Sequence, residues 1–242
     1  MSKEFGGPIG QKYARIDIAG RQALKQEGAI KELEGFGETL KNRFLVAIQF
    51  APESRQEVQK RVINEVEQIE VNCKMEFFLT NRDFPLHSTI EEGVYQGDDD
   101  SIKGEVFAEM AKELKQLNWQ MLNEPLTYKY VLIDKGNIIL TAIEIPDVVT
   151  KLRRELTTFY TAHQLKPLPI EHILHVTVGR ITRLPGEHEE EALEKYKRRM
   201  IQLRHDIAKN PLKLSIGEMF AGSSYDFLHS LQIKKDSSIT QL

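Results

Sequence analysis

The chain has 242 residues, of which 40% are hydrophobic and 29% are charged. This length suits one large domain or two intimate lobes, and this composition excludes a chain that is mainly disordered. The formal net charge of −3 argues against the binding of long nucleic acids, although a local basic pocket can still hold one phosphate.

The sequence favours a soluble protein. The single cysteine, Cys73, cannot form an intrachain disulfide, and the N-terminus MSKEFGGPIG lacks the apolar run of a signal peptide. No window approaches the roughly eighteen consecutive apolar residues that a membrane-spanning helix needs. We therefore expect a cytoplasmic protein with no membrane contact, and we expect it to be a monomer.

Residues 1–40 are rich in glycine and charge, and Gly28, Gly35 and Gly37 interrupt a patchy helical periodicity. We interpret this segment as a partly helical N-terminal extension that is packed on the domain or loosely attached. We assign residues 41–242 to one two-lobed domain.

From residue 43 onward the hydrophobic periodicities become sharper and predict alternating strands and helices. The predicted elements are, in chain order, a strand at 43–50 (RFLVAIQF), a helix at 54–69, strand-like residues at 74–90, a helix at 106–117, strands at 128–134 and 137–145, a helix at 148–163, a strand at 173–181 (ILHVTVGRI), a helix at 189–208, and strands at 212–220 and 227–235. A hairpin turn is predicted at Lys135-Gly136.

This order of elements repeats, so the chain consists of two similar halves. Each half contains a strand, a helix and a strand with a His-x-Thr motif. The hairpin and the closing strands favour antiparallel sheets over a doubly wound parallel sheet. We therefore predict an α+β fold, duplicated and bilobal.

The two His-x-Thr motifs are FPLHSTIEEG, with His87 and Thr89, and ILHVTVGRI, with His175 and Thr177. Because alternate side chains of a strand point to opposite faces, the histidine and the threonine of each motif share a face. A single such pair on a strand is usually incidental. Two of them, each followed by an apolar residue and one in each half, indicate a common function.

Two histidines that face each other suit the cleavage of phosphodiesters near neutral pH. With an ordinary pKa near 6.5, one imidazole can accept a proton while the other donates one to the leaving oxygen. The threonine hydroxyls can donate hydrogen bonds to the phosphate oxygens on which charge develops. This chemistry requires no metal and no cofactor.

The paired motifs HSTI and HVTVGR, in two related halves, resemble the two-histidine (2H) phosphoesterase superfamily, including its 2'-5' RNA ligase and cyclic phosphodiesterase branch. The resemblance extends from about Arg43 to the C-terminus, and the second motif is the closer match. It implies two antiparallel sheets that flank a central cleft with helices on the outside, and metal-independent cleavage or joining of RNA-type phosphodiesters. It also implies a catalytic set of His87, Thr89, His175 and Thr177.

Two glutamates after the first motif depart from the family pattern. If the strand continues, Glu91 shares a face with His87 and Thr89, where it would raise the pKa of a nearby histidine and repel phosphate. If the strand ends, both Glu91 and Glu92 are solvated, and this second alternative is the simpler one.

Further residues are candidates for substrate binding. Arg180 falls on the face opposite His175 unless Gly179 forms a bulge, so it either contacts phosphate or forms a structural salt bridge. Tyr225 resembles an aromatic residue that borders the cleft in relatives, and it either stacks on a base or packs in the structure. His172 and His175 have a spacing that suggests metal ligation, but on a strand they point to opposite faces, so we expect no metal site.

We therefore expect a metal-independent phosphodiesterase that acts on a nucleotide or a short oligonucleotide, at a 2',3'-cyclic phosphate or a 2'-5' linkage. Reversible 2'-5' RNA ligation is an alternative within the same family. A non-catalytic module that binds a nucleotide is an alternative of another class, although binding alone does not require two titrating groups.

Overall fold

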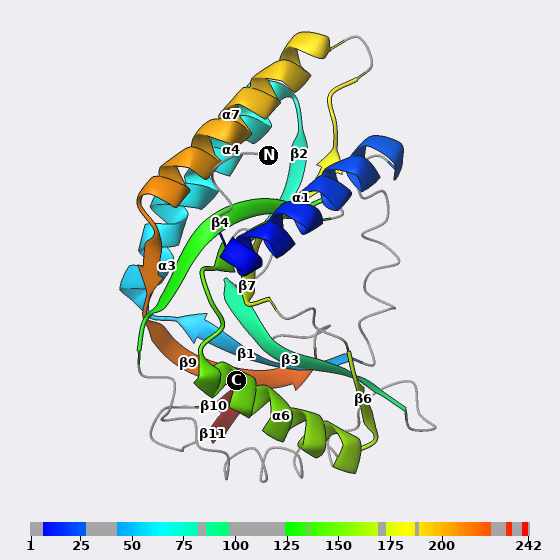
Figure 1. Ribbon diagram of the computed structural model, residues 1–242, viewed down its shortest axis with the longest axis vertical. Helices are drawn as coiled ribbons and strands as arrows, with labels where there is room; N and C mark the ends of the chain where they lie inside the picture. Colours follow the sequence, from blue (N-terminus) through cyan, green and yellow to red (C-terminus); the bar gives the residue numbers. More distant parts are fainter. Residues whose placement is uncertain are drawn as a thin grey trace.

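The computed structural model describes residues 7–27, 43–81, 86–96, 124–134, 136–168, 173–186, 189–223, 231–233 and 239–241. Its strands pair in antiparallel fashion throughout and form one continuous sheet, against which the helices pack (Figure 1). The predicted α+β class is confirmed. Within these residues, no helix combines the length and the apolar character that crossing a membrane requires.

The first half follows the predicted order, with one difference. The strand-like residues 74–90 form two strands with different partners, and Asn81 ends the first of them because its backbone turns into the left-handed region with φ of 61°. The elements are β1 (Arg43–Phe50), α3 (Pro52–Val58), a π-helical turn η1 (Gln59–Ile63), α4 (Asn64–Cys73), β2 (Glu76–Leu79) and β3 (His87–Tyr95).

The second half begins with the predicted hairpin. Gly136 lies in its turn with φ of 81°, in the left-handed region that glycine adopts without steric cost. The elements are β4 (Leu126–Asp134), β5 (Asn137–Ala142), α6 (Asp147–Ala162), β6 (Leu165–Pro167), β7 (His175–Arg183), α7 (Glu190–Lys209), β8 (Leu212–Leu214), β9 (Ile216–Ser223), β10 (Leu231–Ile233) and β11 (Ile239–Gln241). The helix predicted at 106–117 lies outside the described residues.

The sheet consists of two lobes. One lobe has the strand order β11-β10-β9-β1-β3, with β6 on the other edge of β3, and the second lobe has β7-β5-β4-β8, with β2 on the other edge of β7. The lobes exchange a strand, because β2 follows β1 in the chain and pairs with β7, whereas β6 follows β5 and pairs with β3. β3 and β7 join the lobes through one residue pair, Ser88 and Val176.

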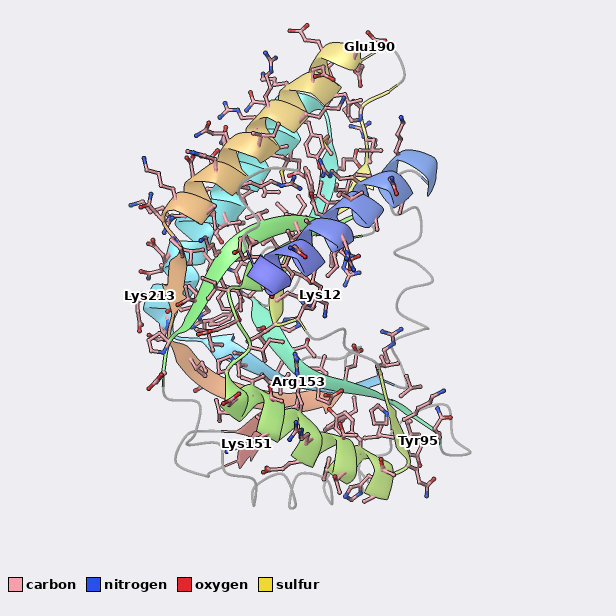
Figure 2. All side chains as sticks on the ribbon, in the orientation of Figure 1. Lys12, Tyr95, Lys151, Arg153, Glu190 and Lys213 are labelled. Carbon is pink, nitrogen blue, oxygen red and sulfur yellow. The ribbon has the colours of Figure 1, made fainter. Side chains whose placement is uncertain are left out.

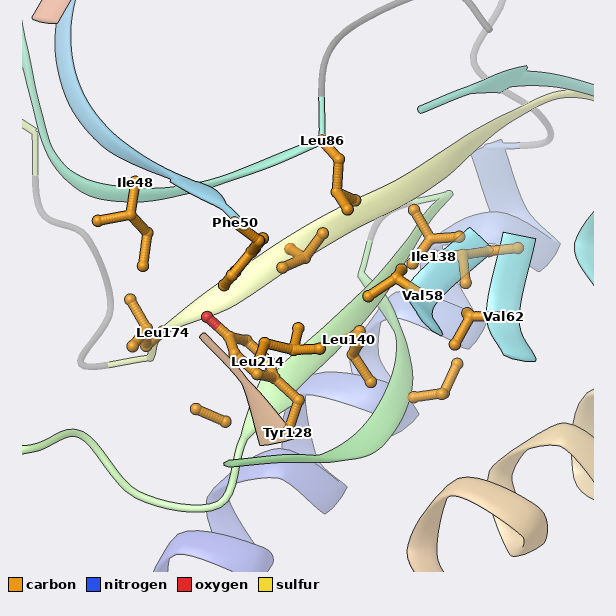
Figure 3. Packing of buried hydrophobic residues seen from close by; sticks show 14 of the residues in the cluster. Ile48, Phe50, Val58, Val62, Leu86, Tyr128, Ile138, Leu140, Leu174 and Leu214 are labelled. Carbon is orange, nitrogen blue, oxygen red and sulfur yellow. The ribbon is translucent and has the colours of Figure 1, made fainter. Parts of the chain in front are cut away.

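The largest hydrophobic cluster extends through both lobes under helices α3, α4, α6 and α7, and a smaller one joins Tyr13 of α1 to Tyr130, Leu132 and Ile139 on the opposite face of β4 and β5. α4 and α7 pack on each other, with α7 against β4, and α6 packs on β3 and β6. Figure 3 shows Val58 of α3 beside Ile138 of β5, and Phe50 of β1, which contacts the Tyr128 ring, nearer to the other end of the cluster. Its labelled members include Ile48, Phe50, Val58, Ile138 and Leu140.

The N-terminal helix α1 (Gly7–Glu27) packs along β4, in front of the sheet in Figure 1. The Tyr13 hydroxyl donates a hydrogen bond to the Ala142 carbonyl at 2.8 Å. The buried Asp17 carboxylate accepts one from the Ile133 amide at 2.9 Å and one from the Arg204 side chain on α7 at 2.6 Å. α1 therefore packs on β4 at Tyr130 and Ile133, beyond the residues Leu126–Tyr128 that pair with β8.

Replacement of Gly20 by alanine should destabilise the protein. A Cβ atom at this position would lie 2.1 Å from the Ile133 carbonyl oxygen, so α1 would have to move away from β4. We expect a loss of about 1–3 kcal/mol in the free energy of unfolding, as for other overpacked sites, although Gly→Ala in a free helix gains roughly 1 kcal/mol. Urea unfolding measures the change. Ala19→Ser, at the exposed neighbouring position, is the control, and a stabilised Gly20→Ala would contradict the docking of α1.

Candidate active site

The two His-x-Thr motifs meet where β3 and β7 cross. Ser88 of the first motif pairs with Val176 of the second, and both side chains are fully buried in the core side of the sheet. The histidine and the threonine on either side of each are only half-buried, since they point to the other face. We call this the histidine face, and it carries His87, Thr89, His175 and Thr177.

The antiparallel pairing sets each histidine beside the threonine of the other strand. Because Ser88 lies opposite Val176, His87 lies beside Thr177 and Thr89 beside His175. The charge of His87 contributes to the low pKa of His175, so the two imidazoles are close in space. The crossing thus gathers two imidazoles and two hydroxyls around one point.

A β-bulge follows the first motif and changes the face of the sheet to which Glu91 and Glu92 point. Ala47 of β1 pairs with Thr89, but Val46 pairs with Glu91, so Ile90 is an extra residue in β3. Glu91 therefore shares a face with Val46 and is buried in the core, with 5% of its surface exposed. Glu92 takes the place on the histidine face.

Both expectations for these glutamates are therefore wrong. The strand does not end after Ile90 but continues to Tyr95, and Glu91 does not stay beside His87. A plain count of alternating residues fails here because the bulge inserts one residue into the count.

A matching bulge follows the second motif. Ile139 of β5 pairs with Thr177, but Ile138 pairs with Gly179, so Val178 is the extra residue in β7. Arg180 consequently returns to the histidine face. The structure thus contains the bulge on which phosphate contact by Arg180 depends, and Arg180 occupies the position in the second motif that Glu92 occupies in the first.

Arg180 and Glu92 form part of a charged group on the histidine face. Glu92 forms a salt bridge with Arg43 of β1 at 3.4 Å. Burial lowers the pKa of Arg180, and the negative charge of Glu92 opposes this shift while Arg43 adds to it. Two guanidinium groups therefore share one carboxylate, which leaves an excess of positive charge near the histidines.

The buried Ser88 fixes the second motif through its backbone. Its hydroxyl donates a hydrogen bond to the His175 carbonyl at 2.7 Å. This bond reinforces the single pair that joins the strands, because it ties the core side of β3 to the residue that carries the second imidazole. The sequence pattern assigned Ser88 only to the opposite face and gave no signal for this role.

His175 has a strongly lowered pKa. Burial is the largest cause, followed by the positive charges of His87, Arg153 and Arg180, and together they lower the pKa from 6.5 to about 4. Its Nδ1 atom is buried and has no hydrogen-bond partner within the described part of the chain. A protonated ring would bury an unsatisfied N–H there, so the neutral form dominates at pH 7.

The buried Glu91 lies near the Arg153 guanidinium, behind the crossing. Burial raises the pKa of Glu91 to about 7, although the nearby positive charge of Arg153 opposes this shift. The Tyr160 hydroxyl donates a hydrogen bond to the Glu91 backbone carbonyl at 3.1 Å. Glu91 thus titrates near neutral pH behind the motif strands.

The remaining sequence candidates have different outcomes. Tyr225 lies outside the described residues. Phe78 of β2 was missed, and it pairs with Arg180 across the β2–β7 ladder and is half-exposed on the histidine face. The strand-like run around Phe78 was visible in the sequence, but its pairing with β7 was not.

In the described ranges, no group of three or more His, Cys, Asp or Glu side chains could hold a metal ion.

Comparisons with known proteins give a likeness of fold. No family model and no curated protein matches the sequence. The crystal structure of ATU0111, a conserved protein of unknown function from Agrobacterium tumefaciens, matches with a TM-score of 0.53 and 10% identity, over 90% of this chain and 94% of that chain. This match shows that the two proteins share a fold.

Two structures of Usb1 from Kluyveromyces marxianus also match. The TM-scores are 0.45 with 11% identity for Usb1 and 0.42 with 13% identity for Usb1 with uridine monophosphate. Both matches cover 81% of this chain and 99% of the Usb1 chain.

Replacement of Glu91 by glutamine should change how stability depends on pH. A carboxyl group whose pKa rises on folding from 4.5 to about 7 loses stability as the pH rises through that window, because the folded state binds the proton more tightly. Glu91→Gln removes this loss. Relative to wild type, we expect the variant to gain about 2 kcal/mol in unfolding free energy between pH 5 and pH 8.

Urea unfolding at both pH values measures this gain. Glu155→Gln, which makes the same change at an exposed position on α6, is the matched control. An equal difference between Glu91→Gln and wild type at both pH values would show that Glu91 does not titrate in this range.

Proposed function

We propose that this protein is a metal-independent phosphodiesterase of the 2H type that acts on a small or terminal RNA-type phosphodiester. The bond would be a 2',3'-cyclic phosphate or a 2'-5' linkage in a nucleotide or short oligonucleotide. The observation that carries the proposal is the crossing of β3 and β7, at which two His-x-Thr motifs from the two halves meet on one face.

The unequal environment of the histidines supports a division of roles. His175 is neutral at pH 7, so it is the base that takes a proton from water or from an attacking hydroxyl. His87 is then the acid that donates a proton to the leaving ribose oxygen. A bound phosphate brings negative charge next to His175, which raises the pKa of the imidazole and makes it a stronger base.

Two proton transfers balance the reaction: His175 takes a proton from water, and His87 gives a proton to the leaving oxygen. In hydrolysis of a 2',3'-cyclic phosphate, the water oxygen forms a bond to phosphorus, one P–O bond to the ribose breaks, and the leaving oxygen receives the proton of the acid. Thr89 and Thr177 donate hydrogen bonds to the non-bridging oxygens, where negative charge increases. Arg180 attracts the phosphate by its charge, and Phe78 offers an aromatic face for a base.

Substitution of either histidine should abolish turnover. We expect His87→Ala and His175→Ala to lose about 100- to 10,000-fold in kcat, and Thr89→Val and Thr177→Val about 100-fold. The assay uses 2',3'-cyclic mononucleotides and 2'-5' and 3'-5' oligoadenylates, with and without EDTA. His205→Ala, at an exposed site on α7, is the control for the loss of an imidazole.

Three results would contradict the proposal. They are no cleavage by the wild type, full activity in a histidine variant, and loss of activity with EDTA. Binding of nucleotides without turnover would favour the non-catalytic module. Joining of a 2',3'-cyclic phosphate end to a 5'-hydroxyl end would favour the ligase.

The pH profile tests the assignment of the base. As the pH falls through the pKa of about 4, His175 takes up a proton and can no longer accept one. We therefore expect kcat/KM of the wild type to fall below about pH 4, which is lower than the limb near 6.5 that an unperturbed histidine would give. An acid limb near pH 6.5 would show that the base is not a histidine with a pKa of about 4, and it would contradict the assignment of His175 as the base.

A further inference from the structure

Arg153 of α6 joins the backbones of both motif strands from the core side of the sheet. Figure 2 labels it where α6 meets the sheet. Its Nε atom donates a hydrogen bond to the Ile90 carbonyl at 2.8 Å, and one of its terminal nitrogens donates to the Ile173 carbonyl at 2.7 Å. Ile90 follows the first motif directly, and Ile173 stands two residues before His175.

Both carbonyls are at irregular points of the backbone. The pairing of β1 with β3 skips Ile90, because Ile90 is the extra residue of the bulge. Ile173 precedes the first residue of β7. A buried carbonyl at such a point needs a hydrogen-bond donor from elsewhere, and one planar guanidinium supplies donors for both. One side chain thus links the backbone that follows the first motif to the backbone that precedes the second.

The charge of Arg153 also acts on the reacting face. Arg153 lies behind the strands, yet its positive charge contributes to the low pKa of His175. The groups that face His175 are His87 on β3, Arg180 on β7 and Arg153 on α6. The groups that face Arg153 are Glu91 on β3, Tyr128 on β4 and Tyr13 on α1.

We propose that Arg153 is a positioning residue for the phosphodiester reaction: its two hydrogen bonds, to the Ile90 and Ile173 carbonyls, set the separation of the His-x-Thr motifs, and its positive charge acts on the motif strands from behind. This inference rests on the proposed function for its catalytic consequence, but its effect on His175 exists without any substrate. The hydrogen bonds of Arg153 go to the backbone on either side of the crossing, so in this proposal it acts through the strands and not by contact with substrate.

Two substitutions separate the two parts of this role. Arg153→Lys keeps the positive charge but replaces the rigid fork with a single ammonium group, which cannot hold both carbonyls in the same geometry. Arg153→Gln removes the charge and shortens the side chain. Arg154→Lys and Arg154→Gln, at the exposed next position of α6, are the matched controls.

In Arg153→Lys we expect kcat to fall about 10- to 100-fold with KM nearly unchanged, because misplacement of catalytic groups slows the chemical step and leaves the binding contacts in place. The acid limb of its pH profile should stay near that of wild type. In Arg153→Gln we expect kcat to fall and the acid limb to move to higher pH, because the loss of a positive neighbour makes His175 easier to protonate.

NMR titration of the His175 imidazole in the unliganded protein gives a readout that does not depend on activity. The midpoint should rise above its wild-type value of about 4 in Arg153→Gln, with burial and His87 still holding it below 6.5, and stay near 4 in Arg153→Lys and in both Arg154 variants. If wild type cleaves no phosphodiester, the proposed function fails, and the titration still decides whether Arg153 controls His175.

The proposal is overturned if Arg153→Lys has the kcat of wild type, or if a folded Arg153→Gln keeps the His175 midpoint of wild type. Circular dichroism and urea unfolding establish that each variant is folded. If Arg153→Gln does not fold, the comparison of kcat and KM in Arg153→Lys decides the positioning role alone. A variant that only loses stability, with unchanged kcat and unchanged titration, identifies Arg153 as a structural residue and overturns the proposal.

Discussion

The crossing of β3 and β7 is the constraint on which the rest of this structure depends. One backbone pair, Ser88 with Val176, joins two lobes that are otherwise separate sheets. A single pair is a weak hinge, since a two-stranded contact gains stability only from its flanking pairs. Three other features stabilise the junction. The Ser88 hydroxyl donates a hydrogen bond to the His175 carbonyl, and the largest hydrophobic cluster extends through both lobes. In addition, one strand of each half pairs with a strand of the other lobe. The imidazoles lie at this junction because each motif straddles the paired residue.

The two bulges decide which charges reach the histidine face. Strict alternation would place Glu91 beside His87 and send Arg180 to the core, so that a carboxylate would repel the phosphate and a cation would be buried. One inserted residue in each strand reverses both placements. The bulge in β3 has a further consequence, because it exposes the Ile90 carbonyl to Arg153 and buries the Glu91 carboxylate near that cation. The same local irregularity thus shapes the front of the site and supplies the anchor behind it.

Much of the strand order and the shared face of the histidine and threonine in each motif could be predicted from the sequence, because period-two alternation and the His-x-Thr pattern are local signals. Local signals failed where a partner strand decides the outcome. Nothing in the residues around Ile90 or Val178 specifies a bulge, since the extra residue is visible only when β1 or β5 is laid beside it. Arg153 was likewise invisible, because an arginine on an amphipathic helix usually points to solvent and only the tertiary fold brings it to two strand carbonyls. The docking of α1 also rests on distant partners, Ile133 and Arg204, which the patchy periodicity of the N-terminal segment does not reveal.

Two similar His-x-Thr motifs on one face would receive a phosphodiester in either direction, yet the proposed reaction needs one direction. The charged groups near the second motif differ from those near the first. Arg180 in the second motif corresponds to Glu92 in the first, and the charge of Arg153 lowers the pKa of His175. A phosphate is attracted by Arg180 and repelled by the Glu92 carboxylate. The electrostatic potential on the histidine face therefore becomes more positive from the first motif toward the second. The histidine that is held neutral lies in the same motif as Arg180. In the proposed reaction, strand β7 therefore both orients the substrate, through Arg180, and provides the base, His175. An exchange of Arg180 with Glu92 would place the orienting charge on β3 and leave the base on β7.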